Sequence, residues 1–160
     1  MSTANKNLSQ NHSANAPDGS HIHMGIVVSE WNENITGNLL QGALETLQKH
    51  GVKSENIKVI YVPGSFELPL GAQKLISKKN IHAVIAIGSV IQGETKHFDF
   101  VCNAVAQGIK DVNLKYDKPV IFCVLTDDTM QQAIDRSGGK YGNKGSDCAL
   151  AALKMCLLEF

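Results

Sequence analysis

Two segments of the sequence combine residue types that bind anions and transfer protons. Residues 93–97 read Gly-Glu-Thr-Lys-His, and residues 136–145 read Arg-Ser-Gly-Gly-Lys-Tyr-Gly-Asn-Lys-Gly. Glycines let a backbone approach a ligand closely, and the N–H groups and dipole at a helix start attract phosphate. His97 carries the side chain best matched to proton transfer near neutral pH. The pattern indicates an enzyme that holds a small phosphorylated substrate near these loops and moves protons with His97.

Each of these features also has a plain structural interpretation. An ordinary helix start resembles the first segment, a solvated basic turn resembles the second, and a lone histidine is more often structural. Neither segment fits G-x-x-x-x-G-K-[ST], and no G-x-G-x-x-G follows the first expected strand, which argues against P-loop and Rossmann sites. What favours a catalytic His97 is its place beside the candidate phosphate loop and near Asp99, which could orient the ring.

Two further residues leave their role open on physical grounds alone. Glu67 could serve the dipole of its own helix or accept hydrogen bonds from substrate hydroxyls. Trp31 could be a hydrophobic residue at the rim of the site or a lid that stacks on a planar heterocycle.

Short β-branched runs alternate with longer segments of helical period, which is typical of βαβ units. Strands are expected at 24–28, 57–62, 82–88 and 119–125. Helices are expected around Ile35 to Leu47, at 67–79, around Phe98 to Val112, at 129–136, and from 143 or 145 to 158. Right-handed crossovers would join the strands into a four-stranded parallel sheet of flavodoxin-like order, with helices on both faces. We therefore expect a single three-layer α/β domain whose ligands bind beyond the carboxyl ends of the strands.

Length and charge limit the class of protein. The 160 residues fit one domain, and fifteen basic residues balance fifteen acidic ones, which predicts no nucleic-acid or membrane partner. No apolar run approaches the roughly 18 residues of a membrane span, and the first two dozen residues lack a secretory signal core, so we expect a cytoplasmic protein. Residues 1–22 are expected to form a flexible extension, and residues 23–160 the folded domain.

The cysteines and the early histidines do not predict a metal site. Cys102, Cys123, Cys148 and Cys156 show no zinc-ligand spacing, and we interpret them as reduced, buried thiols. His21 and His23 end a polar tail that favours solvated disorder over metal binding.

Three long stretches, residues 62–69, 88–101 and 125–145, together resemble the lumazine synthase family of riboflavin biosynthesis. The likeness runs from about Met24 to the C-terminus. It implies an enzyme that condenses 5-amino-6-(D-ribitylamino)uracil with 3,4-dihydroxy-2-butanone 4-phosphate, without metal or organic cofactor.

The resemblance also implies roles for individual residues. Those that would hold the uracil and ribityl groups are Trp31, Ser65, Phe66, Glu67, Ser89, Val90, Ile91 and Phe122, the last supplied by an adjacent subunit. Those that would hold the phosphate are Glu94, Thr95, Arg136 and, with a less defined role, Lys144. His97 would transfer protons. Many family members have Phe where this chain has Trp31, a departure that preserves stacking.

Finally, the resemblance implies an assembly of pentamers with active sites between adjacent subunits, and it raises riboflavin synthase as a candidate partner. The short segment 138–144 favours a closed shell of sixty subunits over isolated pentamers. Two other classes compete with the enzyme: a shell or ligand-binding paralogue without turnover, and a flavodoxin-like FMN carrier. The intact set of Glu67, His97, Phe122 and Arg136 argues against the paralogue, and the carrier would be yellow as isolated.

Overall fold

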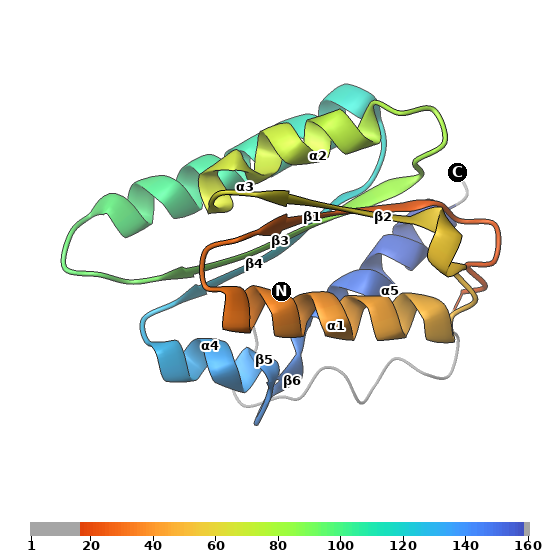
Figure 1. The fold of residues 1–160 in the computed structure, drawn as a ribbon. Helices are drawn as coiled ribbons and strands as arrows, with labels where there is room; N and C mark the ends of the chain where they lie inside the picture. The colour runs from red at the N-terminus through yellow and green to blue at the C-terminus, as the bar shows by residue number, and fades with distance from the viewer. Residues whose placement is uncertain (1–16, 159–160) are drawn as a thin grey trace.

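Four parallel strands form the centre of the molecule. The computed structural model describes residues 17–158. The strands are β1 Met24–Ser29, β2 Ile57–Val62, β3 Ala83–Ile91 and β4 Val120–Asp127, in the order β2-β1-β3-β4 (Figure 1). This is the flavodoxin-like order expected from the sequence, and the prediction of a four-stranded parallel sheet is confirmed.

Helices cover both faces of this sheet. Helices α2 Leu68–Ile76 and α3 His97–Tyr116 pack on one face, and α1 Glu33–Lys49 and α5 Lys144–Cys156 pack on the other (Figure 1). The short helix α4 Met130–Arg136 lies beyond the end of β4. All four strands run the same way, so their carboxyl ends meet at one edge, on the left in Figure 1.

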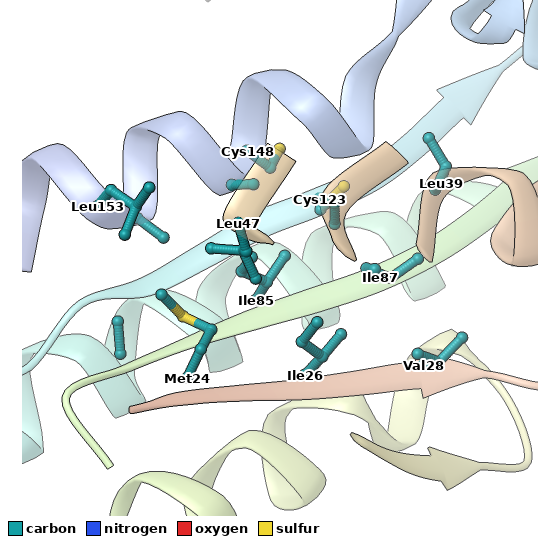
Figure 2. Packing of buried hydrophobic residues seen from close by; sticks show 14 of the residues in the cluster. Met24, Ile26, Val28, Leu39, Leu47, Ile85, Ile87, Cys123, Cys148 and Leu153 are labelled. Atoms are coloured by element: carbon teal, nitrogen blue, oxygen red, sulfur yellow. The ribbon is translucent and has the colours of Figure 1, made fainter. Parts of the chain in front are cut away.

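The two faces have separate hydrophobic cores because successive side chains of a strand point to opposite faces. Ile26 and Val28 of β1 face α1 and α5, together with Ile85 and Ile87 of β3 (Figure 2). Val27 faces α2 and α3. The strand β1 is buried along its whole length because it lies between two other strands and two helical layers.

Three details differ from the sequence-based expectation. The strand β3 extends to Ile91, three residues beyond its expected end, because it stays paired with β4 as far as Asp127. Helix α2 ends at Ile76 rather than at residue 79. The Gly/Lys segment after α4 forms a small hairpin, β5 Ser137–Gly139 and β6 Gly142–Asn143, in which Gly138 and Gly142 have positive φ angles of 116° and 83°.

The described residues before β1 contact the domain. The Gly19 N–H donates to the His50 carbonyl at 2.7 Å, and Ile22 is buried in the core beside α1 and α5. The backbone N–H of His23 donates to the imidazole Nδ1 of His82 at 2.8 Å, so His23 belongs to ordered structure and not to a disordered tail. Residues 1–16 of the expected extension lie outside the described residues. Within residues 17–158, no helix combines the length and apolarity that a membrane span requires.

Candidate functional site

Several buried polar atoms at the carboxyl edge of the sheet lack hydrogen-bond partners. In the described part of the chain, four buried side-chain oxygens make no hydrogen bond: the hydroxyls of Ser29, Ser65 and Ser89, and Oδ2 of Asp127. Ser29 ends β1, Ser65 follows β2, Ser89 lies late in β3, and Asp127 ends β4. An unpaired buried polar atom is costly, so four at one edge indicate a place where a ligand or water supplies the missing partners.

The loop after β1 is tied to this edge. Asn32 adopts the left-handed conformation, with φ 59°, and its side-chain amide donates to the Ser89 carbonyl at 3.0 Å. That contact fixes the turn that carries Trp31, whose side chain is 71% exposed. Sequence reasoning missed Asn32, although Asn is one of the few residue types that adopts this conformation readily.

The segment after β2 forms a single 3-10 turn, Ser65–Glu67, immediately before α2. The absence of a side chain at Gly88 lets Ser65 lie against β3, since a Cβ there would fall 2.7 Å from the Ser65 hydroxyl. Phe66 is 62% exposed, and the half-buried Glu67 places its carboxylate beside Gly64. The three expected ribityl-binding residues therefore lie next to the end of β3, one buried and two accessible.

The segment after β3 supplies the candidate phosphate loop. Ser89 is buried, whereas Val90 and Ile91 are half-buried at the end of the strand. Residues 93–97 are exposed and lead into α3, whose first residue is His97, as the sequence predicts. The His97 N–H donates to Thr95 Oγ1 at 3.4 Å, so one of the N–H groups at this helix start is already engaged. Within the described residues, no hydrogen bond joins the His97 ring to Asp99.

Arg136 ends α4 and bends back along it. Its Nη1 donates to the Gln132 carbonyl at 2.9 Å and lies 3.7 Å from Asp127 Oδ1. Its guanidinium carbon lies 5.3 Å from the centre of the Tyr141 ring. The side chain stays 42% exposed, so other N–H groups of the guanidinium remain available to an anion.

The surroundings of Asp127 shift the pKa of its carboxyl group. Burial raises the pKa of this carboxyl above its ordinary value, nearby Asp128 raises it further, and Arg136 opposes both. Sequence reasoning did not select Asp127. Its position at the end of a strand, nine residues before Arg136, was the available signal.

Two expected site residues lie away from this group. Phe122 is the third residue of β4, an edge strand of the sheet, and its side chain is 38% exposed. Lys144 begins α5 and pairs with Asp147 at 3.5 Å. The close packing of this corner depends on Gly145, because a Cβ there would collide with the Leu39 carbonyl. Among residues 17–158, no hydrogen bond or ion pair joins Phe122, Lys144 or Arg136 to His97.

A groove of about 410 Å³ lies elsewhere, between α1 and the β5–β6 hairpin. None of the expected site residues lines it. Its walls come from Asn38, Gln41, Gly42, Glu45, Ile134, Ser137, Gly138, Gly139, Asn143 and Ser146. The chemistry-bearing residues therefore sit on an open edge and not in the groove.

The cysteines are free thiols. Cys123 and Cys148 are buried between β4 and α5, while Cys102 and Cys156 are only partly buried, contrary to the expectation for all four (Figure 2). A side-chain hydrogen bond with Cys148 that favours the protonated thiol, together with burial, raises the pKa of Cys123. Burial raises the pKa of Cys156 to about 11. In the described region, no three His, Cys, Asp or Glu side chains are grouped as metal ligands.

The matching family model and the similar proteins carry the same description. The family model described as 6,7-dimethyl-8-ribityllumazine synthase matches residues 21–159. Proteins of that name are 57% identical in Parabacteroides distasonis and 59% identical in Cytophaga hutchinsonii, each over 155 residues that cover 97% of both chains. A protein of that name from Porphyromonas gingivalis is 50% identical over 159 residues, or 99% of both chains.

Proposed function

The chain belongs to the 6,7-dimethyl-8-ribityllumazine synthase family, and from this premise we propose the reaction that it catalyses and the residues that carry it. It is a transferase-type enzyme of riboflavin biosynthesis. The proposed reaction condenses 5-amino-6-(D-ribitylamino)uracil with 3,4-dihydroxy-2-butanone 4-phosphate to give 6,7-dimethyl-8-ribityllumazine, phosphate and water. The observation that carries the proposal is the set of unpaired buried oxygens at the carboxyl edge, from which the expected substrate-binding residues extend.

The uracil substrate is proposed to lie over the ends of β1, β2 and β3. The exposed ring of Trp31 would stack on the pyrimidine, and the segment from Ser89 to Ile91 would read its edge. The ribityl hydroxyls would lie along Ser65–Glu67, where the Glu67 carboxylate accepts their hydrogen bonds. A polyol is a suitable ligand here, because it can both donate to and accept from serine hydroxyls that lack partners.

The phosphate substrate is proposed to bind between the start of α3 and Arg136. Backbone N–H groups of Glu94 and Thr95 and the positive end of the α3 dipole would face its oxygens, and the guanidinium would bind them bidentately. Lys144 would add positive charge near the site. These groups would also stabilise the charge that develops when phosphate leaves.

His97 is proposed to transfer the protons. Imine formation requires proton delivery to a departing hydroxyl, phosphate elimination requires removal of a proton, and ring closure releases a second water. An imidazole can act as acid and base in turn, and at the first position of α3 it lies directly beside the proposed phosphate loop. Alignment of two bound substrates would supply much of the remaining acceleration.

The complete site is proposed to form between adjacent subunits of a pentamer, in an assembly of sixty. Support comes from the places of these residues in the described chain, where no hydrogen bond or ion pair links Phe122 or Arg136 to His97. Large exposed side chains also support a covering neighbour, and they include Trp31, Tyr61, Phe66, Leu70, Phe100, Leu114 and Phe122. Riboflavin synthase remains a proposed partner on the strength of the family alone.

The proposed reaction is tested by supplying both substrates and following lumazine fluorescence and phosphate release. The wild-type protein should turn over. Arg136→Ala should lower kcat/KM for the phosphate substrate by about 100-fold or more, and His97→Ala should lower kcat by about 100-fold or more. Arg136→Lys is the matched control, and it should recover part of the loss because it keeps the charge but not the fork of donors. A folded wild-type protein without turnover would refute the proposed reaction.

The shared site is tested by mixing inactive subunits. Oligomers assembled from equal amounts of His97→Ala and Arg136→Ala chains contain some boundaries at which both wild-type residues meet. Random mixing should restore activity at about a quarter of the boundaries if each site takes one residue from each neighbour. No recovery in oligomers shown to be mixed would place both residues in the same chain's site.

A further inference from the structure

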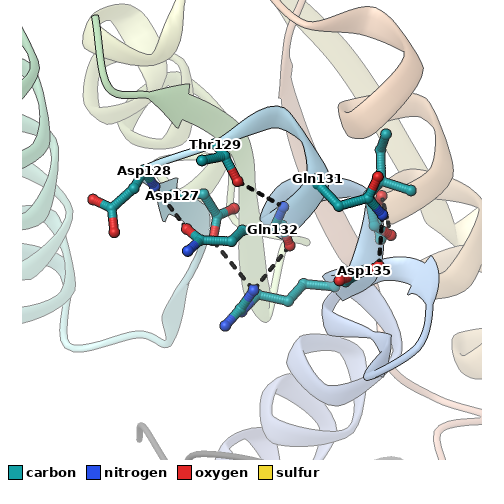
Figure 3. Close-up of polar contacts among 9 residues, drawn as sticks. Asp127, Asp128, Thr129, Gln131, Gln132 and Asp135 are labelled. Carbon is teal, nitrogen blue, oxygen red and sulfur yellow. Dashed lines mark hydrogen bonds and ion pairs between the residues drawn. The ribbon is translucent and has the colours of Figure 1, made fainter.

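The buried carboxyl group beside Arg136 has no role in the proposed reaction. Asp127 is only 5% exposed, its Oδ1 lies 3.7 Å from Arg136 Nη1, and its Oδ2 has no hydrogen-bond partner among the described residues. The same Arg136 nitrogen donates to the Gln132 carbonyl at 2.9 Å, and Figure 3 shows Asp127, Thr129 and Gln132 close together where β4 leads into α4. The arrangement places a negative charge directly behind the arginine that is proposed to grip the phosphate.

The surroundings hold the two partners in place. Thr129 Oγ1 accepts from the Gln132 N–H at 3.3 Å, and Gln132 Oε1 accepts from the Asp128 N–H at 2.8 Å. On the β3 side, the backbone carbonyl of Asp127 accepts from the Gln92 N–H at 2.9 Å. These bonds fix the backbone of Asp127 at the end of β4, with its buried carboxyl group beside Arg136.

Few charges act on this carboxyl group. In the described part of the chain, Arg136 of α4 attracts its ionised form and the exposed Asp128 repels it. Its strand neighbour on β3, Ile91, carries no charge. Burial raises the pKa of Asp127, so its ionised form depends on the arginine more than an exposed carboxylate would.

We propose that Asp127 is a positioning residue that holds the Arg136 guanidinium at the carboxyl edge and, by competing for its charge, limits how tightly the site retains phosphate. The inference rests on the proposed function, because it assumes that Arg136 is the phosphate anchor. A carboxylate on one side of a guanidinium opposes an anion on the other side, and the two are coupled through the same positive charge. The benefit would be release of inorganic phosphate after elimination from the substrate.

Sulfate binding tests the competition, because sulfate is tetrahedral like phosphate but keeps its charge between pH 5 and 8. Calorimetry on the assembled protein would compare wild type, Asp127→Asn and Asp128→Asn at pH 7.5. Asp127→Asn should bind sulfate at least about fivefold more tightly, the low end of typical coupling between sites. Asp128→Asn is the matched control, since it removes the same charge from an exposed position where water screens it, and its affinity should stay close to wild type.

Two further readouts separate positioning from a general structural effect. Asp127→Ala removes the charge and also the oxygen that faces Arg136, so it should bind sulfate more weakly than Asp127→Asn. The difference between wild type and Asp127→Asn should shrink as the pH falls towards the pKa of Asp127, which burial raises above its ordinary value, because protonation neutralises the wild-type carboxyl group. Equal or weaker binding by Asp127→Asn, identical behaviour of Asn and Ala, or a difference that does not change with pH would each overturn the inference.

The lumazine assay distinguishes failure of this inference from failure of the proposed function. Normal wild-type turnover combined with unchanged sulfate affinity in Asp127→Asn would refute only the role of Asp127. Unchanged sulfate affinity in Arg136→Ala would remove the phosphate anchor and with it both proposals. If the inference holds, Asp127→Asn should also show stronger product inhibition by inorganic phosphate.

Discussion

At the amino end of the sheet, polar side chains are paired, whereas at the carboxyl end four buried oxygens are not. Asn113 makes three hydrogen bonds there: two with the backbone of Val120, at 2.6 and 2.7 Å, and one with Ile109. Lys118 donates to the Ile81 carbonyl at 2.7 Å, and His82 accepts from His23. The unpaired oxygens belong to Ser29, Ser65, Ser89 and Asp127.

This contrast separates groups that stabilise the fold from groups kept for a ligand. A paired buried group contributes to the free energy of unfolding, and an unpaired one subtracts from it until a partner arrives. Substitution should therefore cost more stability at the amino end than at the carboxyl end, and three predictions sharpen that difference.

The largest effect is expected from Asn113→Leu at the amino end. It leaves the Val120 N–H and carbonyl without partners, and it should lower the free energy of unfolding by about 2–4 kcal/mol. Urea denaturation at fixed protein concentration measures the change. Asn103→Leu, the same substitution at an exposed position of α3, is the control and should have a much smaller effect. Equal losses of unfolding free energy in the two variants would show that the hydrogen bonds of Asn113 are not the source of the lost stability.

At the carboxyl end, Ser89→Ala is expected to change stability less than Asn113→Leu does and to affect substrate binding instead. The hydroxyl has no partner, so its removal should change the free energy of unfolding by less than about 1 kcal/mol while raising KM for the uracil substrate. Denaturation and steady-state kinetics measure the two quantities on the same preparation. A marked loss of stability with unchanged KM would place Ser89 with the structural groups of the opposite end.

The smallest effect is expected in the pH dependence of stability. Burial lowers the pKa of His82 below its ordinary 6.5, and the charges of His23, Lys118 and His21 lower it further. The unfolded chain therefore binds more protons than the folded one as the pH falls below about 6.5, so stability should decrease through that range. His82→Asn keeps an acceptor for the His23 N–H and should flatten this slope between pH 7 and pH 5. A slope that is unchanged in thermal unfolding would exclude His82 as its source.

Much of the fold followed from local patterns. The short β-branched runs predicted the four strands, and the spacing of apolar residues predicted the helices that connect them. The ends of elements were less predictable. The strand β3 continues to Ile91 because β4 lies beside it, and the run from Ser137 to Asn143 forms a hairpin although its three glycines suggest a loop. Strand length depends on pairing with a distant segment, which no local pattern contains.

The candidate site was predictable only where local sequence marks a residue. His97, Glu67 and Arg136 drew attention through residue type and neighbouring sequence, and they extend from the expected edge. Asn32 and Asp127 did not, because their importance lies in contacts with Ser89 and Arg136 that exist only after folding.

The amino-acid sequence alone determined the alternation of strands and helices, the balance of charge and the resemblance of three long segments to one enzyme family. These properties are local or additive along the chain. Only the tertiary structure decided that the four unpaired buried oxygens gather at the carboxyl end of the sheet. Whether a buried oxygen finds a partner depends on what the fold brings to it, and that is a property of three-dimensional proximity.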